Sequence, residues 1–173
     1  FDMELCFWKH GLKHVPVDQL PHLLEDVVEE QKPKTLKINF LNMLPNGDAD
    51  LVKIAETLKE CTNIKDVLTG ISIPSGIKLT SLKPLSEVGI LKKLEFFTAY
   101  ECGLSGDDVL TSDLCANIPA LRELNISAKN NHNIIILTPD ILRALPSECR
   151  IPISGKDIQV KCFSSENDEV VLK

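Results

Sequence analysis

Two adjacent carboxylates, Asp107 and Asp108, come closest to a catalytic arrangement in this sequence. A neighbouring pair of carboxylates can divide general acid and base work, or hold a divalent cation through its oxygens. The same two residues directly precede the apolar run 109–118. Acidic side chains at that position cap a helix and complement its dipole. We expect this capping role for the pair, and no catalytic one.

Histidine and cysteine are the other residues that can hold a metal or act as nucleophiles. None of the four histidines (His10, His14, His22 and His132) is paired with a cysteine at the spacing of a zinc site. The sequence also lacks the G-x-S-x-G, H-E-x-x-H and G-x-x-x-x-G-K-[ST] motifs. We therefore expect no enzyme activity, no cofactor and no metal.

Six cysteines are spread along the chain without any C-x-x-C pair: Cys6, Cys61, Cys102, Cys115, Cys149 and Cys162. An even number fits a disulfide framework, which is typical of short secreted chains with small cores. A chain of 173 residues with 43% hydrophobic residues does not need such cross-links. We expect six free thiols in a reducing, cytoplasmic environment, with the disulfide framework as the alternative.

Composition limits the class of protein further. The hydrophobic content favours one domain with a sizeable core and argues against wholesale disorder. The net charge of −6 argues against binding to nucleic acids or anionic membranes, which requires clustered Lys and Arg. No apolar run approaches the roughly 20 residues of a membrane span. Because the chain opens at Phe1 without a signal-peptide pattern, we expect a fragment of a larger protein.

Short strand-like segments recur along the chain, and helix-like stretches follow most of them. The strands are expected at 5–7, 36–38, 67–69, 94–96, 124–126 and 151–153, which start 31, 31, 27, 30 and 27 residues apart. The intervening helices are expected at 18–30, 51–58, 109–118 and 139–145, with a shorter one at 82–90 that Gly89 weakens. Ile134–Leu137 predicts either an extra short strand or the lead-in to the next helix. In the tail, the alternation of Ile158, Val160 and Cys162 predicts either one more strand that ends the sheet or the lead-in to a further repeat of the parent protein.

Four of these units carry a further apolar residue three positions before the strand, at Pro33, Ile64, Leu91 and Leu121. The best matches are Leu91-x-x-Leu94-x-Phe96 and Leu121-x-x-Leu124-x-Ile126. The pattern resembles leucine-rich repeats, and repeats of about 28 residues with helices resemble the ribonuclease-inhibitor-like subclass found in NOD-like receptors. In this alignment Cys102 falls three residues beyond the Asn/Cys position of the repeat.

The resemblance implies an α/β leucine-rich-repeat solenoid of six units, starting near residues 2, 33, 64, 91, 121 and 148. One unit alone cannot bury its apolar face, so neighbouring units must stack. Strands are spaced about 4.8 Å apart, whereas a helix is about 10 Å across. The stack therefore bends into a horseshoe arc, with a parallel β-sheet on the concave face and helices on the convex face.

The concave face is the expected site of partner binding. Each unit is expected to expose there the residue between its two inward apolar residues and the two residues that follow. The candidates are Trp8, Lys9, Lys37, Asn39, Phe40, Glu95, Phe97 and Asn125. Trp8, Phe40 and Phe97 are expected to anchor the partner, because aromatic residues dominate interface energies. The alternatives are a one-residue shift in register that turns an aromatic ring inward, or contact with another domain.

The resemblance implies a non-catalytic protein–protein interaction module. Its closest functional match is the ligand-sensing and autoinhibitory repeat region of a cytoplasmic NOD-like innate immune receptor. Its partner would then be another protein or another domain of the parent chain. Two alternatives remain open: the substrate-recognition repeats of an F-box-type ubiquitin ligase adaptor, and a small α/β hydrolase or transferase that mimics the repeat period.

Overall fold

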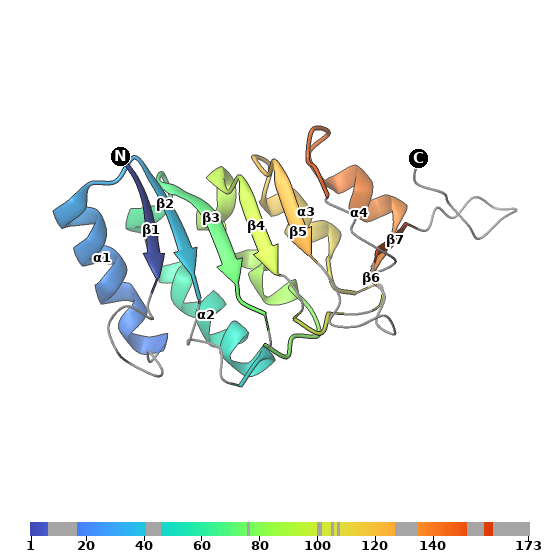
Figure 1. Cartoon of the computed structure of the whole chain (residues 1–173), viewed down its shortest axis with the longest axis horizontal. Coiled ribbons are helices and arrows are strands. Elements are labelled where there is room, and N and C mark those ends of the chain that lie inside the picture. Colours follow the sequence, from blue (N-terminus) through green and yellow to red (C-terminus); the bar gives the residue numbers. More distant parts are fainter. Residues whose placement is uncertain are drawn as a thin grey trace, which may run out of the picture.

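The computed structural model describes residues 1–6, 17–40, 46–75, 77–99, 102–104, 106, 108–126, 135–151 and 158–160. Five parallel strands form the main sheet: β1 (Asp2–Cys6), β2 (Thr35–Asn39), β3 (Leu68–Ile73), β4 (Phe96–Ala99) and β5 (Glu123–Ile126). They lie side by side in chain order (Figure 1). The expectation of an α/β chain with a parallel sheet in sequence order is confirmed for these five strands.

The chain beyond β5 forms a second, two-stranded parallel sheet from β6 (Ile135–Leu137) and β7 (Ile158–Val160). Of the two alternatives for 134–137, the extra strand is therefore the one that forms, and the tail forms a strand that pairs with it and not with the main sheet. The strand expected at 151–153 is only partly described, because residues 152 and 153 lie outside the described ranges. Arg150 nevertheless bridges Glu123 in parallel, and its N–H donates to the Arg122 carbonyl at 2.8 Å.

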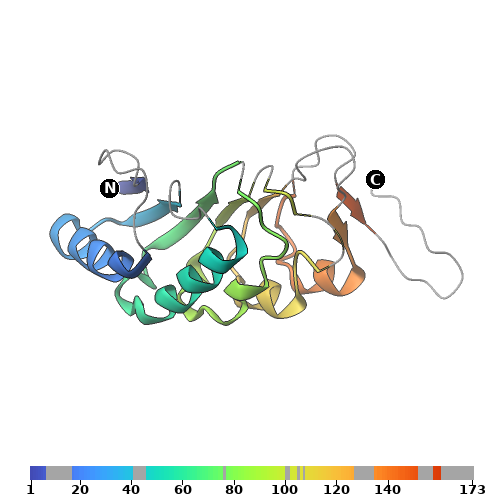
Figure 2. The ribbon, with the colours of Figure 1, turned by 90° about the horizontal axis from the view of Figure 1, so that it is seen from below.

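All the helices that accompany the main sheet lie on one side of it (Figure 2). The α-helices are α1 (Leu20–Gln31), α2 (Asp48–Glu60), α3 (Ser112–Asn117) and α4 (Pro139–Ala144). The 3₁₀ helices are η2 (Val17–Gln19), η3 (Thr62–Ile64), η4 (Lys83–Glu87) and η5 (Gly89–Lys93). None of the helices in the described part of the chain is both long and apolar enough to cross a membrane.

The core lies between this helical layer and the sheet. In α2, Leu51, Ile54 and Leu58 share one buried face because they recur at helical spacing. They pack against the inward residues of the strands, which alternate with less buried ones because the side-chain period of a strand is two. Leu36 and Ile38 of β2 are buried as the sequence predicted, and so are Leu94, Leu124 and Ile126.

The stretch expected as one weak helix at 82–90 forms two consecutive 3₁₀ helices instead. Pro84 lies in the first turn of η4, and Val88 adopts an extended conformation before Gly89 begins η5. The break in helical geometry at Val88 keeps both segments short. This outer layer therefore contains a 13-residue α-helix, α2, followed along the sheet by a five-residue 3₁₀ helix, η4.

Three predicted side-chain orientations are wrong, those of Phe96, Phe97 and Phe40. Phe96 was expected inside and is 37% exposed, whereas Phe97 was expected on the open side and is 4% exposed. The structure pairs Gly70 with Phe96, Ile71 with Phe97 and Thr98 with Asn125, so β4 starts two residues later than the sequence predicts. As in the alternative considered for these strands, an aromatic ring turns inward, but the shift is three residues and not one: Phe97 and Ala99 take the inward positions expected of Leu94 and Phe96. Phe40 is also buried, because its N–H continues the β2–β3 ladder to Ser72 and its side chain follows Leu36 and Ile38 inward.

The helix-capping role expected of Asp107 and Asp108 is also wrong for Asp108, the member of the pair that the structure describes. The helix α3 begins later, at Ser112, and its cap is Thr111, whose Oγ1 accepts the Leu114 N–H at 3.1 Å. Asp108 is exposed, and its backbone carbonyl accepts the Ser81 hydroxyl at 2.7 Å. Asp107 lies outside the described residues.

Candidate functional site

The face of the main sheet opposite the helices, here called the open face, carries two rows of side chains across neighbouring strands. The register pairs Glu4 with Lys37, Lys37 with Gly70, Gly70 with Phe96, and Phe96 with Glu123. We call these five residues the charged row. Arg150 extends this row beyond β5 through its bridge to Glu123, and its guanidinium lies 3.4 Å from the Glu123 carboxylate.

A second row of smaller side chains runs parallel to the first, two residues further along each strand. Its members are Cys6, Asn39, Ser72, Thr98 and Asn125. All five are half-buried. The side chains of this row are short, so the second row forms a low strip beside the longer residues of the charged row.

The centre of the charged row is a contact between Lys37 and Phe96. The Lys37 ammonium lies 4.9 Å from the centre of the Phe96 ring, which is the geometry of a cation–π interaction. The side chain of Lys37 reaches β4 by crossing β3 at Gly70. A Cβ atom at residue 70 would lie only 2.7 Å from Lys37 Cγ, so the absence of a side chain there leaves space for this crossing.

Around this contact the open face is hollowed into a shallow depression of about 220 Å³. Glu4, Lys37, Ser72, Thr98 and Glu123 contribute polar groups to its lining, and Phe96 contributes an aromatic ring. An exposed aromatic ring among polar groups of both charges is an arrangement typical of protein interfaces.

The residues predicted for partner binding are only partly brought together. Lys37 is exposed on the open face, and Asn39 and Asn125 are half-buried there. Glu95 is half-buried immediately before β4, and its carbonyl accepts the N–H groups of Arg122 and Glu123. Phe40 and Phe97 are core residues, so their predicted role as exposed anchors is wrong. Trp8 and Lys9 lie outside the described residues.

Sequence reasoning did not select Phe96, Glu4, Glu123 or Arg150 for this face. One signal was available for Phe96. If the apolar pattern is read as Leu94-x-x-Phe97-x-Ala99, it has the same spacing as Leu68-x-x-Ile71-x-Ile73. That alignment turns Phe96 outward, as in the structure.

The described cysteines are unpaired by disulfides, and none of the three buried ones is suited to act as a nucleophile. Cys6, Cys61, Cys102, Cys115 and Cys149 are free thiols, and Cys162 lies outside the described residues. Burial raises the pKa of Cys102 to about 11, and burial with the charge of Cys149 raises that of Cys115 to about 12. Burial, with smaller contributions from Glu25 and Glu60, raises the pKa of Cys61 to about 11. These three thiols stay protonated at neutral pH and are poor nucleophiles.

Metal binding has no support within the described ranges, where no three His, Cys, Asp or Glu side chains are grouped closely enough to hold an ion. His22 is exposed on α1, and the other histidines lie outside these ranges. Comparison of the chain with family models, curated proteins and solved structures found no match.

Proposed function

We propose that this chain is a non-catalytic protein-interaction module of the leucine-rich-repeat type, and that the open face of its sheet binds the partner. The parallel strands in chain order, with helices on a single side, support a stack of repeated strand–helix units. Buried residues also recur with one spacing in three successive units. They are Leu68, Ile71 and Ile73, then Leu94, Phe97 and Ala99, then Leu121, Leu124 and Ile126.

The position of Cys102 adds to this support. When the repeat is read from Leu94, Cys102 falls three residues after Ala99, in the Asn/Cys position of the leucine-rich repeat. The thiol is fully buried and donates to the Pro74 carbonyl of the preceding unit at 3.3 Å. A side chain that satisfies a neighbouring loop carbonyl is what such a stack needs, since buried backbone groups require partners.

The observation that carries the proposed function is the open face itself. Its exposed side chains belong to strands whose alternate residues hold the core, so the face can vary without disturbing the fold. Phe96 is 37% exposed and is held in place by Lys37, so part of the entropy cost of ordering it on binding is already met. The charged row adds carboxylates and cations that can match a partner's polar groups.

As the parent of this module we propose a cytoplasmic NOD-like innate immune receptor, in which the repeats sense a ligand and restrain a nucleotide-binding domain. The free thiols of the described cysteines support a reducing compartment. The partner of the open face would then be either the sensed protein or the nucleotide-binding domain.

Photocrosslinking in cells tests this assignment. A benzophenone amino acid is placed at Thr98 on the open face and, as the control, at the exposed Asp26 of α1 on the helix side. We expect a protein crosslinked from Thr98 and absent from Asp26, and mass spectrometry then identifies it. Crosslinking to a nucleotide-binding domain supports the receptor assignment. Crosslinks from Asp26 alone would place recognition on the helices and contradict the proposal.

A further inference from the structure

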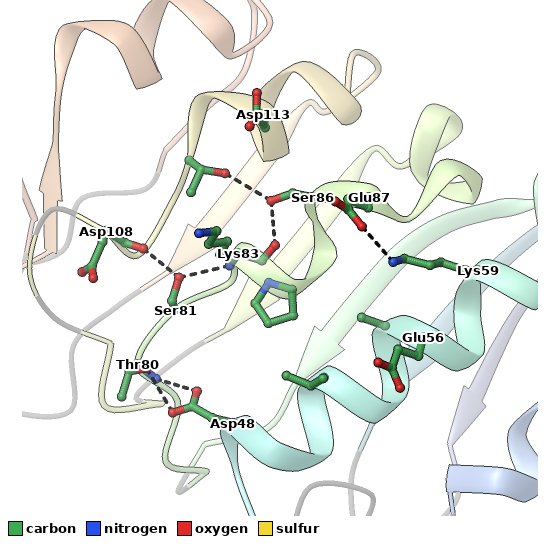
Figure 3. Close-up of a pocket in the computed structure, with 14 residues that line it drawn as sticks. Asp48, Glu56, Lys59, Thr80, Ser81, Lys83, Ser86, Glu87, Asp108 and Asp113 are labelled. Carbon is green, nitrogen blue, oxygen red and sulfur yellow. Dashed lines mark hydrogen bonds and ion pairs between the residues drawn. The ribbon is translucent and has the colours of Figure 1, made fainter.

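The helix side of the molecule carries a groove of about 900 Å³, which lies apart from the open face (Figure 3). Residues of α2 form one wall, η4 and the segment that leads into it form the floor, and residues 108–113 contribute the other wall. This volume is within the range of pockets that bind ligands, about 300–1,000 Å³.

The groove has a physical origin in the unequal helices of the outer layer. Both α2 and α3 pack against η4. Because η4 is a 3₁₀ helix of five residues, it is shorter and narrower than the 13-residue α2 beside it. The surface is therefore lower at η4 than at α2. Pro84 and the extended Val88 keep η4 short, so these two residues account for the groove at the level of the local sequence.

Polar groups on the floor bond to one another. The Ser81 hydroxyl donates to the Asp108 carbonyl at 2.7 Å, and the Ser86 hydroxyl donates to the Lys83 carbonyl at 2.6 Å. The Asp48 carboxylate accepts the N–H and the hydroxyl of Thr80, at 2.9 and 3.0 Å. These bonds fix the shape of the groove before any ligand arrives.

The walls carry carboxylates that these bonds do not use. Glu56, Asp108 and Asp113 line the groove, and their side chains make no hydrogen bond or ion pair to any residue that the structure describes. Glu87 is paired with Lys59 at 3.0 Å. Lys83 is then the one unpaired ammonium among the described lining residues, so the unpaired charge of the groove is negative.

An apolar surface lies between these charges. Val52 of α2 is 44% exposed, one of three large hydrophobic residues that are exposed in the described chain. Ala55 and the half-buried Pro84 line the groove together with it. An exposed aliphatic residue inside an acidic groove is complementary to a ligand with both an apolar and a cationic part.

We propose that this groove is a second docking site, and that it binds a short basic segment of a protein partner. An aliphatic side chain of the segment packs on Val52 and Pro84. Its Lys or Arg residues pair with Glu56 of one wall and with Asp113 of the other. Because the groove lies on the helix side, it can be filled while the open face is occupied. This site does not depend on the function proposed for the open face.

Fluorescence anisotropy with a labelled Arg-Arg-Leu-Arg-Arg peptide tests the site on the full 173-residue chain. The charge-reversal variant Glu56→Lys/Asp113→Lys should weaken binding about tenfold or more. The matched variant Asp26→Lys/Glu29→Lys on α1 makes the same change in net charge outside the groove, and it should weaken binding less than about threefold. Equal losses in both variants would mean general charge attraction, and would overturn the proposal. So would an unchanged affinity in the groove variant, or no binding to the parent chain.

A second pair of measurements separates the apolar contact from the charges. Val52→Ser should weaken binding of the same peptide about threefold to tenfold, because it removes the aliphatic contact. A peptide with Ser in place of the central Leu should bind the parent chain more weakly, and should bind Val52→Ser with no additional loss. Independent, additive losses would show that the leucine does not contact Val52. Circular dichroism melts check that each variant folds, and Glu56→Gln/Asp113→Asn replaces the charge-reversal variant if that one does not.

Discussion

The ammonium of Lys37 on β2 lies 4.9 Å from the centre of the Phe96 ring on β4, and the two side chains meet across Gly70 of the intervening β3. Three neighbouring strands therefore cooperate in presenting one exposed aromatic ring. The contact depends on two features: the glycine that leaves space above β3, and the register that turns Phe96 outward and Phe97 inward.

Gly70→Ala should break this contact while the fold persists. The added Cβ would lie 2.7 Å from Lys37 Cγ, so the lysine must adopt another rotamer. A double-mutant cycle between Lys37→Met and Phe96→Leu should give a coupling of about 0.5–1 kcal/mol in the parent chain. In the Gly70→Ala background the coupling should fall to about zero. An unchanged coupling there would show that the glycine plays no part in positioning the lysine.

Adjacent phenylalanines on β4 should respond to truncation in opposite ways. Phe97→Ala should lower the free energy of unfolding by about 3–5 kcal/mol, because the ring is buried among Leu94, Leu114 and Leu124. Phe96→Ala should cost less than about 1.5 kcal/mol, since it removes a partly exposed ring and one cation–π contact. Urea unfolding of both variants measures the difference. Similar losses would contradict the register of β4.

The beginning of α3 gives a prediction about capping. Thr111→Ala removes the acceptor of the Leu114 N–H and should lower the free energy of unfolding by about 1 kcal/mol. Thr111→Ser keeps the acceptor and should restore most of this stability. Asp108→Ala should change stability by less than about 0.5 kcal/mol, because its exposed carboxylate caps no helix. A larger loss for Asp108→Ala than for Thr111→Ala would restore the capping role that the sequence indicated for the acidic pair.

Stability should fall at alkaline pH because of the buried thiols. Burial raises the pKa of Cys102 from 9.0 to about 11, so the thiol ionises more easily in the unfolded chain than in the native one. The stability that the native state gains from the protonated Cys102 thiol is fully present below about pH 9, and it is lost as the pH rises from 9 through 11. Cys102→Ala should therefore lose less stability than the parent chain between these two values. Parallel pH profiles for Cys102→Ala and the parent chain would show that Cys102 contributes nothing.

The parallel sheet was predictable because its signal repeats. Each strand contains apolar residues at alternate positions, such as Leu36 and Ile38, and α2 carries Leu51, Ile54 and Leu58 at helical spacing. These two periods distinguish strand from helix. The apolar faces of the strands and of the helices can be buried only if neighbouring units stack, and this stacking places the strands in chain order.

The register of β4 was not predictable from the unit itself. Buried residues recur every three positions from η4 through η5 and into β4, at Leu85, Val88, Leu91, Leu94 and Phe97. In this series Leu91-x-x-Leu94 and Leu94-x-x-Phe97 match the start of the repeat pattern equally well. The repeat pattern can therefore be placed on this unit in two ways that differ by three residues. The 3₁₀ geometry causes this ambiguity, because its period is three residues. Pairing of β4 with β3 removes the ambiguity, and that pairing is a tertiary property.

The charged row was missed for a related reason. Its members are brought together only by the register between strands, and Glu4, Phe96 and Arg150 are far apart in the sequence. The groove on the helix side depends on the difference between an α-helix and a 3₁₀ helix. The sequence indicated a short segment at Gly89 but not a 3₁₀ one, so it gave no sign of a groove.

The affinity of the chain for the protein captured from Thr98 tests most directly whether the open face is the recognition surface. Phe96→Ala should weaken this binding by more than about 1 kcal/mol in calorimetric titration. Phe1→Ala is the matched control, because Phe1 is 66% exposed and lies outside both rows. We expect a loss of affinity for Phe96→Ala and unchanged affinity for Phe1→Ala. Unchanged affinity for Phe96→Ala, or equal losses in both variants, would contradict this expectation.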